Sequence, residues 1–150
     1  MDVLRYIFQD TKRQYQDFCR ETLVDSGGDF WKMVEELFHQ VLYRDYSGRL
    51  ARLFQNVLTY AEAEKFVKIL RESGGDGKKM DEWMYEQVDK SQLRIESLEE
   101  FRVLIEMCML AILMAFAQRY KDKESIESVE WSFFRKMDFL KNGVLKHKES

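Results

Sequence analysis

Residues 98–120 read LEEFRVLIEMCMLAILMAFAQRY, and this stretch decides the fold. Between positions 101 and 117 only Arg102 and Glu106 carry charge, and beyond Glu106 the one polar side chain is the thiol of Cys108. A helix that is apolar on every side is normally buried on every side. We therefore expect residues 98–120 to form the central helix of a small all-α domain, with amphipathic helices around it.

Glycines mark the ends of the surrounding helices, because each lies between stretches with helical spacing of apolar residues. They are Gly27, Gly28, Gly48, Gly74, Gly75, Gly77 and Gly143. The spacing predicts helices over about 2–23, 29–44, 50–58, 59–73, 79–90 and 125–141 in addition to 98–120. The result is a compact bundle of about seven helices, with one globular domain over 1–143 and a polar tail at 144–150.

Local signals support three of these helix starts, and one of them is a Thr-x-x-Glu capping box formed by Thr59 and Glu62 at the start of helix 59–73. Asp29 precedes a face of apolar residues and can accept hydrogen bonds from free backbone N–H groups as an N-cap. Ser97 and Glu100 form a Ser-x-x-Glu capping box at the start of the central helix. The face that follows Asp29 is expected in the core: Phe30, Met33, Val34, Leu37, Phe38 and Val41.

The length, composition and net charge of the chain narrow the class of protein. A chain of 150 residues with 45% apolar and 34% charged residues can bury a core without metal or disulfide staples. The net charge of −3 lacks the basic excess that is typical of nucleic-acid-binding domains. We expect Cys19 and Cys108 to be buried, reduced thiols of a cytoplasmic protein without a signal peptide. The apolar run is too short and too charged to span a membrane.

Candidate catalytic and metal groups are sparse. Glu36 and His39 have the Glu-x-x-His spacing of di-iron proteins, but a second such pair is missing and the other histidine lies in the tail. The glycine-rich loop at 74–79 lacks the spacing and the hydroxyl of a phosphate-binding loop. Glu106 is a candidate perturbed acid if buried, and pairing with Arg102 four residues earlier is the simpler account. The sequence therefore predicts no enzyme, no cofactor, no metal site and no catalytic residue.

Aromatic side chains are the remaining anomaly, since Phe, Tyr and Trp make up 14% of the chain. Several lie off the predicted core faces, and exposed Tyr and Trp often carry protein-binding energy. The predicted partner-binding residues are Trp31, Tyr43, Tyr46, Trp131 and Phe134. Apolar residues on two faces of helix 125–141 further predict a symmetric homodimer.

The helix expected at 59–73 and the loop after it offer a different function. Their basic residues could form a local patch for nucleic acid despite the acidic net charge: Lys65, Lys68, Arg71, Lys78 and Lys79. The alternatives are therefore a nucleic-acid-binding regulatory protein using this patch and, third, an enzyme of unrecognised type.

A hydrophobic central helix wrapped by amphipathic helices resembles the apoptosis-regulator fold of the B-cell-lymphoma-two type. That family's Asn-Trp-Gly-Arg signature is absent, because residues 95–98 read Ile-Glu-Ser-Leu at that place, and no site residue is transferred. The main prediction is a non-enzymatic helical module that binds a protein partner, such as an inhibitor, immunity or adaptor protein of viral or phage origin.

Overall fold

The computed structural model describes residue 13 and residues 16–44 and 80–144. Within these ranges every regular element is helical, which confirms the all-α class. Residues 16–25 are helical and lead through a turn into α2 (Phe30–His39) and the π-helical turn η1 (Gln40–Arg44). The helices predicted at 50–58 and 59–73 lie outside the described residues.

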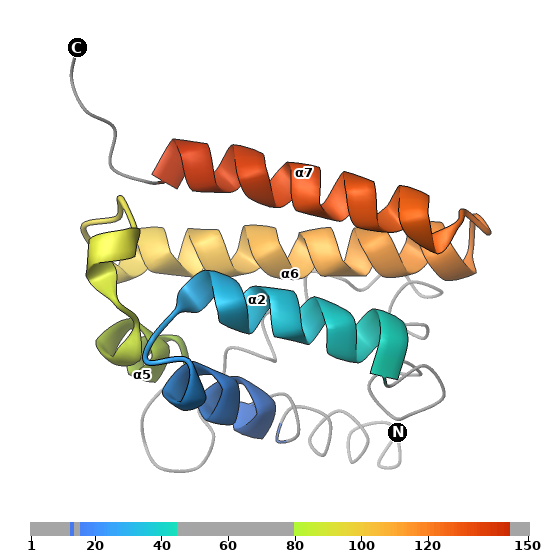
Figure 1. Cartoon of the computed structure of the whole chain (residues 1–150). Coiled ribbons are helices and arrows are strands. Elements are labelled where there is room, and N and C mark those ends of the chain that lie inside the picture. Colours follow the sequence, from blue (N-terminus) through green and yellow to red (C-terminus); the bar gives the residue numbers. More distant parts are fainter. Residues whose placement is uncertain (1–12, 14–15, 45–79, 145–150) are drawn as a thin grey trace, which may run out of the picture.

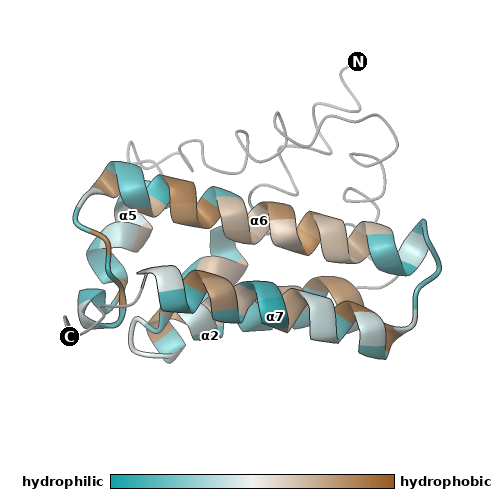
Figure 2. Ribbon diagram, turned by 90° about the horizontal axis from the view of Figure 1, so that it is seen from above, coloured by the Kyte–Doolittle hydropathy of each residue, from teal (hydrophilic) through white to brown (hydrophobic). Residues whose placement is uncertain are grey.

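The second half of the chain supplies the longest helices. It contains α5 (Met80–Gln87), the 3-10 turn η2 (Lys90–Gln92), α6 (Leu98–Tyr120) and α7 (Ile126–Val144). α6 and α7 run antiparallel side by side, and α2 lies along them (Figure 1). Viewed from above, α6 and α7 again lie next to each other, and α2 lies partly behind α7 (Figure 2).

α6 begins and ends where the sequence predicts. The Ser97 hydroxyl accepts a hydrogen bond from the backbone N–H of Glu100 at 3.2 Å. The Glu100 carboxylate in turn accepts from the backbone N–H of Glu96 at 2.7 Å, so two of the free donors at the helix start are satisfied. The capping box is thus confirmed. Its return hydrogen bond comes from the N–H of Glu96, one residue before the N-cap Ser97.

The core lies where α2, α6 and α7 meet. All six predicted core residues of α2 and its extension are buried, from Phe30 to Val41. The rings of Phe38 and Phe133 stack with centroids 4.1 Å apart, which joins α2 to α7. Phe30 meets Phe101 edge-on at 5.5 Å, which joins α2 to α6. These are favourable aromatic geometries in addition to the apolar area that they bury.

The composition of α6 predicts burial on every side, but the structure shows that one side is exposed. Ten of its residues are buried, but one line along the helix faces solvent. The reason is geometric: among the described elements, α2, α5, η1 and α7 contact this helix, and the exposed residues lie outside these contacts.

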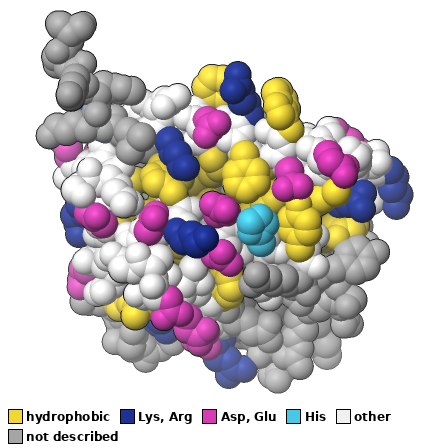
Figure 3. Space-filling model, viewed as in Figure 1, with side chains coloured by type: hydrophobic (Ala, Val, Ile, Leu, Met, Phe, Trp, Pro, Cys, Tyr) yellow, Lys and Arg dark blue, Asp and Glu magenta, His cyan; other side chains and the backbone are white. Residues whose placement is uncertain are grey.

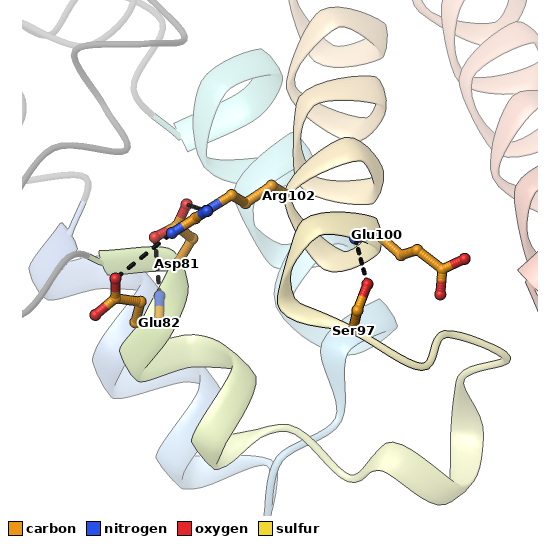
Figure 4. A network of polar contacts seen from close by, with 5 residues as sticks. All are labelled: Asp81, Glu82, Ser97, Glu100 and Arg102. Carbon is orange, nitrogen blue, oxygen red and sulfur yellow. Dashed lines mark hydrogen bonds and ion pairs between the residues drawn. The ribbon is translucent and has the colours of Figure 1, made fainter.

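An ion-pair clip fastens α5 to α6 (Figure 4). The Arg102 Nε donates to Asp81 Oδ2 at 2.7 Å, and its Nη2 lies 3.5 Å from Glu82 Oε1. The Asp81 side chain is only 3% exposed, so the guanidinium compensates a buried charge. The expectation that Arg102 pairs along its own helix with Glu106 is therefore wrong, and Glu106 is exposed rather than buried.

The α6–α7 turn sets the antiparallel pairing of the two helices. The backbone N–H groups of Lys121 and Asp122 both donate to the carbonyl of Ala117, at 2.8 and 3.0 Å. Arg119 Nη1 donates to the carbonyl of Glu124 at 3.0 Å. These bonds satisfy carbonyl groups that the end of α6 leaves free and return the chain towards α7.

α7 is longer than the sequence predicts, because it continues through Asn142 and Gly143 to Val144. The cost of Asn and Gly in a helix is only about 1 kcal/mol per residue, which favourable packing elsewhere in the helix can override. Its inner face is the predicted one, with Val129, Phe133 and Met137 fully buried.

Candidate functional site

An exposed apolar line on α6 is the first feature of the candidate site. It consists of Val103, Met107, Leu110 and Met114, which are 58%, 46%, 36% and 50% exposed. Their spacing of four, three and four residues places them on one side of the helix. We call these four residues the α6 stripe. None of these four side chains carries charge, and the exposed Glu106, three residues after Val103 and four before Leu110, lies beside them on the same side of the helix.

A second exposed line runs along α7 and consists of Trp131, Arg135 and Phe139, which we call the α7 stripe. Trp131 and Phe139 are 70% and 68% exposed. The guanidinium carbon of Arg135 lies 6.0 Å from the Trp131 ring centre and 5.6 Å from that of Phe139. A cation held between two rings is a cation–π arrangement, and it keeps both rings outside the core.

The two stripes belong to neighbouring helices. α6 and α7 pack directly on each other along their length. Figure 3 shows hydrophobic side chains on both sides of a basic side chain at the upper edge of the molecule, over α7. Each stripe exposes several apolar side chains, and exposed apolar patches mark interaction surfaces in soluble proteins.

A cluster of rings where α2 and η1 meet α7 is a second candidate. The His39 ring lies 5.4 Å from that of Tyr43 and 6.3 Å from that of Phe134. Desolvation, followed by a hydrogen bond and the charge of Glu130, raises the pKa of Tyr43 well above its usual range. Tyr43 therefore keeps its proton and ties the π-helical turn to α7.

The predicted partner-binding residues fall in different surroundings. Trp131 belongs to the α7 stripe, and Tyr43 to the ring cluster. Phe134 is half-buried and packs edge-on against Phe38, and Trp31 is partly buried against Phe30. Tyr46 and all five residues of the predicted basic patch lie outside the described residues: Lys65, Lys68, Arg71, Lys78 and Lys79.

Sequence reasoning missed the α6 stripe entirely and found only part of the α7 stripe. A fully apolar helix gives no pattern that separates its buried sides from an exposed one, so the four α6 residues carried no signal. Trp131 and, to a lesser extent, Phe139 were expected to lie away from the core side of helix 125–141, whereas Arg135 was not singled out.

The polar chemistry of the described residues is limited. In these ranges no group of three His, Cys, Asp or Glu side chains is placed to hold a metal ion. Burial raises the pKa of the Cys108 thiol to about 12, so this sulfur stays protonated near neutral pH. Within the same ranges no helix is long and apolar enough to cross a membrane.

A sequence model of the family described as "Tetracyclin repressor-like, C-terminal domain" matches residues 29–144. The chain belongs to this family. The match begins at Asp29, the N-cap of α2, and ends at the last residue of α7. The tetracyclin-repressor-like domain thus contains both exposed stripes. No curated protein matches the chain, and neither does any solved structure.

Membership of this family overturns the main prediction from the sequence. The expected inhibitor, immunity or adaptor protein of viral or phage origin is wrong, and the nucleic-acid-binding regulatory alternative agrees better with the family. The reasoning failed because missing catalytic groups and surplus aromatic residues are common to many non-enzymatic helical proteins.

Proposed function

We propose that this chain is the dimerising regulatory domain of a transcriptional regulator of the tetracyclin-repressor type. The observation that carries the proposal is the combination of the family match over 29–144 with the exposed apolar side chains of the α6 and α7 stripes. Such a domain binds a second copy of itself and a small-molecule effector, and it changes how the regulator engages DNA. It performs no catalysis, and it works in the cytoplasm, where the DNA is accessible.

The size of the face is suited to a stable dimer. α6 has 23 residues and α7 has 19, which at 1.5 Å per residue gives lengths of about 35 and 29 Å. Two adjacent helices, each about 10 Å wide, present roughly 600 Å² per protomer. A symmetric pair would bury at least about 1,200 Å², the lower limit of specific interfaces.

The composition of the face supports the same partner. Its α6 half presents four apolar side chains beside the exposed Glu106, and its α7 half offers Trp and Arg, which are typical of interface hot spots. In a two-fold arrangement the same patch meets itself, so an apolar stripe is self-complementary. The predicted basic patch at 65–79 remains a separate prediction for contact with nucleic acid.

Gene regulation is tested by transcript profiling in the native host. Deletion of the gene should change the levels of a small set of transcripts. Reintroduction of the wild-type gene should restore those levels. A Leu110→Glu, Met114→Glu variant should fail to restore them, because charges in the apolar stripe oppose pairing. Lys121→Glu, an exposed change outside both stripes, is the control and should restore them. An unchanged transcript profile after deletion would contradict the proposed function.

A further inference from the structure

The methionines divide sharply into two groups. Of the seven within the described ranges, five are buried to 4% exposure or less: Met33, Met80, Met84, Met109 and Met137. The other two, Met107 and Met114, are about half exposed, and both belong to the α6 stripe. They lie seven residues apart, which is two helical turns, so their thioethers project from one side of the helix.

Met107 and Met114 therefore carry the exposed sulfur atoms among the described residues. Both cysteines of the chain are buried, and the Cys108 thiol stays protonated near neutral pH. A protonated, buried thiol reacts slowly with oxidants, because the thiolate is the reactive form. A thioether needs no deprotonation, so exposure alone decides which methionines react.

We propose that Met107 and Met114 are oxidation sites through which a peroxide controls the self-association of this chain. The inference rests on the proposed dimer and adds a regulation of that same face. In the reaction a sulfur lone pair attacks one oxygen of hydrogen peroxide, an S–O bond forms and the O–O bond breaks. The sulfur is oxidised by two electrons to the sulfoxide, and the peroxide is reduced to water.

Oxidation acts on the dissociated chain, where both sulfurs are open to solvent, and opposes re-association. The sulfoxide converts a flexible apolar side chain into a polar one. In a two-fold interface each change occurs twice, so a fully oxidised pair would bury four sulfoxides. A buried polar group without a partner weakens association by about tenfold or more. Four such groups acting independently would weaken association about ten-thousandfold, and because neighbouring groups are not independent we expect a rise in the dissociation constant of about a hundredfold to ten-thousandfold.

The experiment treats the full chain with hydrogen peroxide and measures two quantities. Peptide mass spectrometry locates the added oxygen, and analytical ultracentrifugation gives the dimer dissociation constant before and after treatment. Circular dichroism checks that the treated chain remains helical. Repair by methionine sulfoxide reductases, which reverse the reaction, should restore the original constant.

Two variants make the test specific. Met107→Leu with Met114→Leu removes both sulfurs while keeping the apolar character of the stripe, and its own dissociation constant is measured first. Peroxide should leave that constant unchanged. The matched control is Met84→Leu, a buried methionine whose replacement should leave the peroxide response intact.

The outcomes separate this inference from the function on which it rests. Preferential oxygen addition at Met107 and Met114, with weakened pairing only where both sulfurs are present, supports it. An untreated dimer that survives oxidation at both sites unchanged would overturn the regulation and leave the dimer intact. Untreated chains that stay monomeric would overturn both the dimer and its regulation.

Discussion

The turn before α2 offers a prediction with its own internal control. Gly27 and Gly28 both have positive φ, at +70° and +90°. A Cβ at position 27 meets nothing within 4 Å, whereas one at position 28 would lie 2.6 Å from the backbone oxygen of Gln87. The Gly28 carbonyl also accepts a hydrogen bond from the backbone N–H of Asp89 at 2.8 Å. Gly28 therefore makes the close contact between this turn and the end of α5.

Alanine at the two positions should differ in cost. A positive φ costs a non-glycine residue about 1–2 kcal/mol, and reduced freedom in the unfolded chain returns about 0.4–1 kcal/mol. Gly27→Ala should therefore lower the free energy of unfolding by about 0.5–1 kcal/mol. Gly28→Ala adds a backbone clash of about 1–3 kcal/mol and weakens a hydrogen bond of about 1 kcal/mol.

Urea unfolding followed by circular dichroism measures the difference. Gly28→Ala should be less stable than Gly27→Ala by about 2–4 kcal/mol, which corresponds to roughly 5–15 °C in Tm for a chain of this size. All samples need one protein concentration, because a dimer's stability depends on it. Equal destabilisation within about 0.5 kcal/mol would refute the close approach of the turn to α5.

Three further predictions test the packing of the core, the burial of the two cysteines and the raised pKa of Tyr43. Phe133→Ala removes a fully buried ring and should cost about 3–5 kcal/mol in urea unfolding, and a loss below 1 kcal/mol would place that ring outside the core. Cys19 and Cys108 should resist a chromogenic thiol reagent at pH 8 in the native chain and react at once in urea, while fast native reaction would show that they are accessible. Desolvation, followed by Glu130, raises the pKa of Tyr43 in the folded chain. The stability that neutral Tyr43 contributes to the fold is therefore complete below about pH 10 and is lost as the pH rises further. Tyr43→Phe should flatten this alkaline decline in unfolding measurements, and identical pH profiles would contradict the raised pKa.

The fold was predictable wherever local chemistry decides the structure. The bounds of α6 follow from its capping box and from the charged residues after its apolar run. The buried face of α2 follows from its three-four spacing. The partner of Arg102 was not predictable, because Asp81 is 21 residues away and only the packing of α5 against α6 brings them together.

The candidate site was harder to predict, for a physical reason. Apolar residues on every side of α6 predict that the helix is buried, but they do not indicate which element or chain covers each side. A side covered by a second chain looks in sequence like a side covered by the same chain. The exposed positions, such as Met107 and Met114, therefore became visible only when the described neighbours of α6 were in place.

The mass of the wild-type chain in solution tests the central claim most directly. Sedimentation equilibrium at micromolar concentration should give twice the 18.1 kDa of one chain. Leu110→Glu with Met114→Glu should give the mass of one chain while keeping the helical spectrum of the wild type. A wild-type mass of 18.1 kDa that persists at high micromolar concentration would contradict the claim that α6 and α7 form a dimer face.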